Sequence, residues 1–211
     1  WKNFIFRRVN MMKLLFLLRK LTRIMTCHRT KKVYYKSKIC EKDWRFYIMN
    51  IVVLAGGLST ERDVSFKTGD MVSKALRENG HKVILLDVFM GYSDKEEDLT
   101  GIFDRTEEVS VKVSDIPETA PDLEKVKASR KDQSACFFGP NVIRMCQMAD
   151  IVFMALHGEN GENGKIQATF DLFGIKYTGT GYLSSALAMD KGMAKQLFLA
   201  GGIPTPQGIS M

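Results

Sequence analysis

The strongest constraint on the fold is an alternation of strand and helix signals that begins close to Met49. The apolar run Ile51 to Ala55 is followed by two glycines and then by apolar residues at helical spacing as far as Glu78. A second apolar run, from Lys82 to Val88, follows Gly80. Short apolar runs bounded by glycine are typical of buried strands. Strand, helix and strand in this order favour parallel pairing, so the sequence predicts an α/β fold with a mostly parallel sheet flanked by helices.

The same alternation continues toward the C-terminal end. It predicts, in order, a helix over 141–148, a strand over 151–156, a helix over 166–173, a strand over 175–178, a helix over 183–199 and a proline-rich linker over 201–206. Thr60 and Asp63 resemble a capping box at the start of the first helix. Residues 91–147 are charged and poorly periodic as far as Asp132, so we expect an irregular insertion there, with the acidic pairs at 96–97 and 107–108 exposed to solvent.

The net charge of +7 is unevenly distributed along the chain. Residues 1–48 hold 14 lysines and arginines against two acids, whereas residues 49–211 hold 17 against 22. The acidic body carries no basic stripe for nucleic acid. The apolar run at 11–18 is shorter than the roughly 18 to 20 residues that span a bilayer, although a basic amphipathic surface helix is an alternative. We therefore expect residues 1–48 to be an extension outside the native protein, and no nucleic-acid or membrane partner for residues 49–211.

The four cysteines show no metal-binding spacing. Cys27, Cys40, Cys136 and Cys146 contain no C-x-x-C pair, which argues against a zinc site and against a disulfide framework. Reduced thiols are typical of the cytoplasm, which we take as the location.

Three loops carry polar residues that could bind a ligand. They are GGLSTERDVS at 56–65, HGENGENG at 157–164, and GTG at 179–181 with MDK at 189–191 on the following helix. The first two follow strands of one predicted sheet, so they could meet at the edge where α/β sheets bind small ligands. Their glycines permit close backbone approach, and His157, Glu159 and Glu162 offer charge and hydrogen bonds. The alternatives are a solvated surface turn and, for Glu61, a partner of the helix dipole.

Together these loops resemble one family. LAGGLSTERDVS at 54–65, HGENGENGKIQA at 157–168, YTGTG at 177–181 and SALAMDK at 185–191 are similar to the N-terminal half of D-alanine–D-alanine ligase, an ATP-grasp enzyme of bacterial wall synthesis. The resemblance covers residues 49–211. It implies a Rossmann-like, pre-ATP-grasp N-terminal domain over 49–181, a helix and linker over 182–211 leading to an ATP-grasp domain, and a full-length protein that is a homodimer.

The resemblance also implies roles for individual residues. Glu61 would anchor the ammonium of the first D-alanine, and His157 would lie beside the same substrate, linked to its carboxylate; both are candidate catalytic residues. Val64 and Ser65 would line this subsite, and Lys191 would contact nucleotide phosphates. A carboxylate suits an ammonium because a charge-assisted hydrogen bond also fixes its orientation.

The implied reaction joins two D-alanines at the expense of ATP. The carboxylate of the first D-alanine attacks the γ-phosphate to give an acyl phosphate, and the amine of the second displaces phosphate. In the family, the ligands of Mg²⁺ and most ATP contacts come after the position of Met211, so we predict no metal ligand within this chain. We expect a truncated N-terminal part that is inactive alone, from a parent that is an active ligase of peptidoglycan precursor synthesis.

Three other functions remain open from the sequence. A D-alanine–D-lactate or D-alanine–D-serine ligase would share these motifs. A non-catalytic binding module could retain the fold. A membrane-surface or nucleic-acid-binding protein would depend on residues 1–48, where the positive charge lies.

Overall fold

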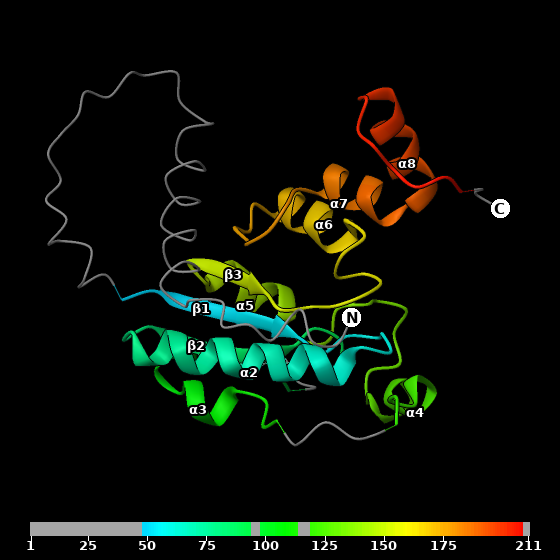
Figure 1. Cartoon of the computed structure of the whole chain (residues 1–211). Coiled ribbons are helices and arrows are strands. Elements are labelled where there is room, and N and C mark those ends of the chain that lie inside the picture. The colour runs from blue at the N-terminus through cyan, green and yellow to red at the C-terminus, as the bar shows by residue number, and fades with distance from the viewer. Residues whose placement is uncertain (1–47, 94–97, 114–118, 209–211) are drawn as a thin grey trace, which may run out of the picture. The chain divides into compact units, whose positions relative to one another are not determined.

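A parallel three-stranded sheet forms the centre of the described part of the chain. The computed structural model describes residues 48–93, 98–113 and 119–208, so the expectations for residues 1–47 lie outside it. The strands are β1 (Asn50–Ala55), β2 (Lys82–Asp87) and β3 (Ile151–Met154) (Figure 1). Their order is β2-β1-β3, and both pairings are parallel. This confirms the predicted α/β fold and places the loops after β1 and β3 on neighbouring strands.

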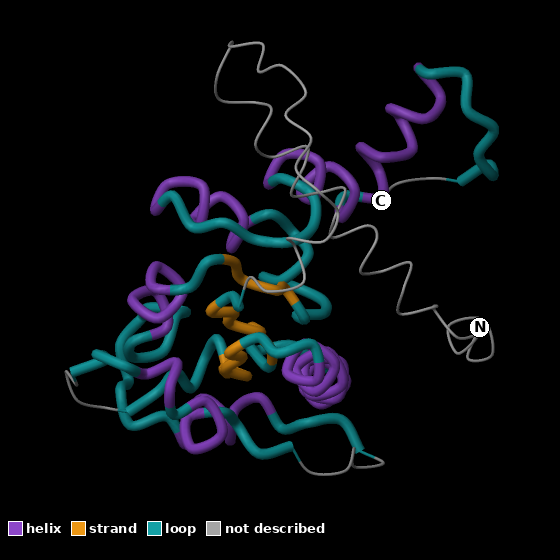
Figure 2. The backbone as a smooth tube through the Cα atoms, turned by 90° about the vertical axis from the view of Figure 1, so that its left-hand side faces the viewer, coloured by secondary structure: helices purple, strands orange, loops and turns teal. Residues whose placement is uncertain are grey.

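Both faces of β1 are covered. Ile51, Val53 and Ala55 belong to a core cluster that includes Leu76 of α2 (Arg62–Glu78). The alternate residues of β1 belong to a second cluster, with side chains from α5 (Val142–Met148) and α6 (Lys165–Phe173). Figure 2 shows the strands nearly end-on, with α2 seen down its axis on one side and α5 on the other. A central strand buried on both faces explains the continuous apolar run at 51–55.

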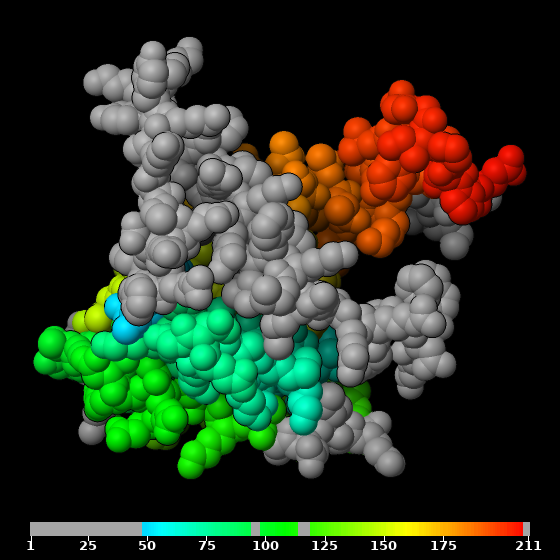
Figure 3. All heavy atoms as spheres, turned by 60° about the vertical axis from the view of Figure 1, so that its left-hand side comes forward, coloured from blue at the N-terminus to red at the C-terminus, as the bar shows by residue number. Residues whose placement is uncertain are grey.

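The helix α2 lies unusually close to the sheet at Gly69. A Cβ atom at this position would lie 2.7 Å from Leu85 Cδ1 and 3.1 Å from Ala55 Cβ, which is too close without movement of either neighbour. The opposite face of α2 is open to solvent: Met71 is 55% exposed, and the atoms of α2 lie at the surface in Figure 3.

The segment predicted as an irregular insertion is more closely tied to the core than expected. It contains the short helices η2 (Ile102–Asp104), α3 (Thr106–Val109) and α4 (Leu123–Ser129) before α5. Its apolar side chains Leu99, Ile102, Phe103 and Val109 are buried in the core cluster of α5. Scattered apolar residues in a charged segment give no periodic signal, which is why the sequence missed this packing. Glu107 and Glu108 are exposed, as predicted, and residues 96–97 lie outside the described residues.

The helix predicted over 183–199 is interrupted, so that prediction was wrong. The structure has α7 (Tyr182–Met189) and α8 (Lys191–Ala200), with Asp190 between them in an extended conformation. The Asp190 carboxylate accepts a hydrogen bond from Met193 N at 2.9 Å. This aspartate therefore acts as the N-cap of a new helix, which aspartate does better than it continues an existing one.

Two further predictions need correction. The strand over 175–178 is reduced to one bridge between Val152 and Tyr177. The Thr178 hydroxyl accepts from Met154 N at 3.1 Å, so a side chain takes the place of a backbone partner where a ladder would continue. The capping box is also absent: α2 begins at Arg62 after Glu61, with no side-chain cap bond.

Within the described ranges, none of the helices is long and apolar enough to cross a membrane. Cys136 is a free, exposed thiol, and burial raises the pKa of the free Cys146 thiol to about 12.

Close packing of α2 yields a stability prediction. Gly69→Ala should destabilise the protein by about 1 to 2 kcal/mol, because overpacking at Leu85 outweighs the helix propensity gained by alanine. Gly181→Ala is the matched control, since Gly181 has φ −67° and a Cβ there would meet nothing within 4 Å. Urea unfolding measures both; a Gly69→Ala protein as stable as Gly181→Ala would contradict the close contact.

Candidate functional site

The loops that follow β1 and β3 meet through one serine hydroxyl. Ser59 Oγ donates to His157 O at 2.9 Å and accepts from Glu61 N at 3.1 Å. A Cβ atom at Gly158 would lie 3.1 Å from Glu61 Oε2 and 3.2 Å from Ser59 Oγ, so the Glu61 carboxylate lies against the backbone of the second loop. The structure therefore brings Glu61 and His157, 96 positions apart in the sequence, to one edge of the sheet.

Ser65 joins the same two strands below this edge. Its hydroxyl donates to Ala155 O at 2.8 Å and accepts from Gly56 N at 2.9 Å, and its side chain is fully buried. The only hydroxyl proton is thus used within the protein. These contacts give Ser65 a positioning role, and its direct contact with a substrate stays a prediction. Val64, one residue earlier, is 45% exposed.

A buried ion pair, which the sequence did not indicate, fixes the first loop. Arg62 and Asp87 are paired at the end of β2, with side chains 10% and 3% exposed. Arg62 Nη1 also donates to Gly57 O at 2.6 Å, and Asp87 Oδ1 accepts from Gly57 N at 3.3 Å and from Phe89 N at 2.9 Å. The guanidinium lies over the Phe66 ring, 4.9 Å from its centroid. Both polar groups of the Gly57 backbone are therefore held by one pair of charges.

Glycine is required where this pair contacts the backbone. Gly56 and Gly57 have φ of +75° and +85°, a conformation that favours glycine. A Cβ at Gly56 would lie 2.7 Å from Asp87 Oδ1. Gly56 and Gly57 thus permit both the backbone conformation of the turn and the close approach of the ion pair.

The acidic residues of the second loop mainly hold the loop itself. Glu162 Oε2 accepts from Gly158 N at 3.0 Å, and Glu162 N donates to Gly158 O at 3.0 Å. Glu159 pairs with Lys165 at 3.4 Å on the exposed side. Gln167, buried below the loop, donates to Gly161 O at 2.8 Å. Of the three polar side chains considered for ligand binding, His157 alone directs its polar group toward α2, where its Nε2 lies 3.2 Å from Thr68 Oγ1.

Side-chain contacts join the third loop, and Tyr177 just before it, to the helices on either side. Thr180 Oγ1 and Ser185 Oγ lie 2.9 Å apart, and Tyr177 Oη donates to Asp171 Oδ1 at 3.1 Å. Burial, followed by the charge of Asp171 and this hydrogen bond, raises the pKa of Tyr177 to about 12. Lys191 is exposed at the start of α8 and donates to Ala188 O at 3.0 Å. For the described residues, no hydrogen bond joins Lys191 to the first two loops.

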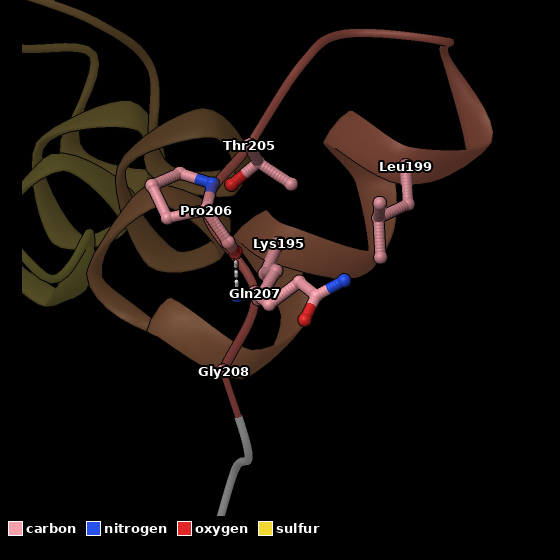
Figure 4. A pocket seen from close by; sticks show the side chains of 6 residues that line it. All are labelled: Lys195, Leu199, Thr205, Pro206, Gln207 and Gly208. Carbon is pink, nitrogen blue, oxygen red and sulfur yellow. Dashed lines mark hydrogen bonds between the residues drawn. The ribbon is translucent and has the colours of Figure 1, made fainter.

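A separate hollow of about 380 Å³ lies between α8 and the segment that follows it (Figure 4). It is lined by Lys195, Leu199, Thr205, Pro206, Gln207 and Gly208. The Lys195 ammonium donates to Pro206 O across it. None of the predicted site residues lines this hollow.

Among the described residues, no group of three or more histidine, cysteine, aspartate or glutamate side chains could hold a metal ion.

Comparison with known proteins identifies what the chain is similar to. Residues 50–180 match the family model described as D-ala D-ala ligase N-terminus. The D-alanine–D-alanine ligase of Lacticaseibacillus casei (strain BL23) is 46% identical over 158 residues, which cover 74% of this chain and 43% of the relative. That of Pediococcus pentosaceus is 43% identical over 161 residues, covering 75% and 45%. A solved D-alanine–D-alanine ligase from Bacillus anthracis is 28% identical, with a TM-score of 0.44, covering 75% and 37%. The chain spans less than half the length of the curated relatives.

The buried ion pair yields a second stability prediction. Asp87→Asn should cost about 3 to 5 kcal/mol, because it leaves the Arg62 charge buried without compensation. Asp104→Asn breaks the exposed pair with Lys82 by the same chemical change and should cost less than about 1 kcal/mol. Free energies of unfolding in urea distinguish the two, and equal losses would show that the buried pair does not hold the loop.

Proposed function

Because the chain belongs to the D-alanine–D-alanine ligase family, we propose that residues 49–181 hold the first D-alanine in the ATP-dependent joining of two D-alanines for peptidoglycan precursor synthesis. The whole protein is proposed to be a D-alanine–D-alanine ligase. The edge formed by the loops after β1 and β3 is its first amino-acid subsite. A cytoplasmic location and a homodimeric full-length protein belong to the proposal and rest on family membership alone.

The observation that carries the proposal is the meeting of Glu61 and His157 at this edge. A single hydroxyl, that of Ser59, bonds both the backbone N–H of Glu61 and the backbone carbonyl of His157. An amino acid carries its ammonium and its carboxylate on the same carbon atom, so its recognition requires an anionic group and a hydrogen-bonding group near each other. Glu61 and His157 supply these two groups from two loops that hydrogen bonds hold side by side.

The exposed carboxylate of Glu61 suits an ammonium. Across the described residues, its side chain takes part in no ion pair and no side-chain hydrogen bond, whereas Asp87 and Glu162 are occupied within the protein. Holding the ammonium at Glu61 would leave the carboxylate of D-alanine available as the nucleophile toward the γ-phosphate. Val64, the exposed third residue of α2, is proposed to line the part of the subsite that receives the methyl group of D-alanine.

We propose nucleotide and metal contacts only for described residues whose chemistry suits a phosphate or a metal ion. ATP would supply the phosphoryl group that activates the carboxylate. Lys191 presents an exposed ammonium, the charge that a phosphate requires, and is the proposed nucleotide contact. The described residues form no carboxylate cluster that fits Mg²⁺, so no step is assigned to a metal in this domain.

Calorimetric titration of the 211-residue protein with D-alanine tests the role of Glu61. Glu61→Gln should weaken binding about tenfold or more, since a hydrogen bond to a charged group contributes about 1.5 to 3 kcal/mol. Glu159→Gln is the matched control, because that carboxylate lies in the neighbouring loop but pairs with Lys165. D-alanine binding that is unchanged in Glu61→Gln would overturn the assignment.

A further inference from the structure

The hydroxyl of Thr68 lies between a backbone carbonyl of its own helix and the ring of His157. Thr68 is one turn after Val64 in α2, and its Oγ1 lies 3.0 Å from Val64 O, to which it donates. The same oxygen lies 3.2 Å from His157 Nε2. Threonine in a helix commonly bonds the carbonyl four residues earlier, but here the oxygen has a second partner, His157, in the loop after β3.

The number of protons available assigns the direction of both bonds. A carbonyl oxygen can only accept, so the single proton of the hydroxyl is directed at Val64 O. The oxygen can then only accept from His157, which requires a proton on Nε2. In neutral histidine one ring nitrogen carries the proton and the other has a lone pair, and the bond made by one nitrogen sets the state of the other. With the hydroxyl proton on Val64 O, neutral His157 carries its proton on Nε2 and leaves Nδ1 unprotonated.

We propose that Thr68 is a positioning residue that fixes the tautomer and orientation of His157, so that Nδ1 is the ring atom presented to the bound amino acid. This rests on the proposed D-alanine subsite. Nδ1 can accept from an ammonium when the ring is neutral and donate to a carboxylate when the ring is protonated. For the described residues, no hydrogen bond to another protein group involves Nδ1.

The location of Thr68 on α2 gives the proposal its structural basis. Glu61 directly precedes the first residue of α2, and Thr68 lies about two turns along it. The Glu61 carboxylate and the His157 imidazole are thus both positioned by the same helix. That helix is held against the sheet by the buried Arg62 and Ser65 contacts. Thr68 adds a hydrogen-bonding contact from α2 to the His157 ring.

Nitrogen-15 spectra of the histidine rings test the proposal directly. The chain has three histidines, and a His157→Gln protein identifies the signals of His157. In the wild type, Nε2 should resonate as a protonated nitrogen and Nδ1 as an unprotonated one. Thr68→Val removes the hydroxyl at similar size, and the two shifts should move toward each other as the second tautomer becomes populated. Thr68→Ser keeps the hydroxyl and should restore the wild-type separation.

D-alanine affinity gives the functional half of the test. Thr68→Val should weaken binding about two- to tenfold, the loss expected for one hydrogen bond, and Thr68→Ser should recover most of it. If no variant binds D-alanine while the tautomer shifts follow the hydroxyl, the proposed function fails and the tautomer assignment stands.

A wild-type ring protonated mainly at Nδ1 would overturn the Thr68 proposal, as would a Thr68→Val spectrum identical to wild type. The first of these outcomes needs no Thr68 variant, so the proposal stays testable even if Thr68→Val does not fold.

Discussion

The buried pair of Arg62 and Asp87 is the interaction on which the site depends. Two charges removed from water are stabilised only when their remaining hydrogen-bonding groups are also satisfied. Here the additional bonds go to the N–H and the C=O of Gly57 and to Phe89 N. Arg62 is the first residue of α2 and follows Glu61 directly. The ion pair thus fixes the turn after β1, the start of α2 and, through them, the backbone position of the carboxylate.

Strand order turns this local constraint into a site. Because β1 lies between β2 and β3, its loop can be anchored to β2 on one side and can reach β3 on the other. Ser59 and Ser65 make the second connection by donating to the carbonyls of His157 and Ala155, two residues apart at the end of β3. A displacement of either loop would break hydroxyl bonds that are partly or fully buried. The relative position of Glu61 and His157 is therefore determined by packed and hydrogen-bonded groups on both loops.

The sequence was most informative where a local pattern alone decides the structure. Apolar runs bounded by glycine located all three strands, and the rule that parallel strands share an edge predicted that the loops at 56–65 and 157–164 could meet. The sequence-based predictions failed where one side chain competes with a backbone pattern. Asp190 ends one helix and caps the next, and the Thr178 hydroxyl bonds the Met154 N–H where the predicted fourth strand would continue. By residue type alone, Glu159 and Glu162 were as plausible as His157. The family resemblance selected His157, and the structure gives both glutamates partners within the protein.

The remaining part of the site could not be found by sequence reasoning because its partners are distant along the chain. Asp87 is 25 residues from Arg62, and His157 is 89 residues from Thr68. An aspartate at the end of a strand and a threonine within a helix have no local signature that distinguishes them from solvated residues. The motif glycines did carry a signal, and the structure gives its cause: positive φ and close approach of Asp87 at Gly56.

We propose that the loops after β1 and β3 form one amino-acid site. Amide chemical shifts of the labelled protein, followed during titration with D-alanine and separately with propionate, test it most directly. We expect saturating shifts at residues 57–61 and 157–158 with D-alanine and much smaller ones with propionate, which lacks the ammonium. Shifts that cluster instead around the hollow at Lys195 and Gly208, or equal responses to both compounds, would contradict it.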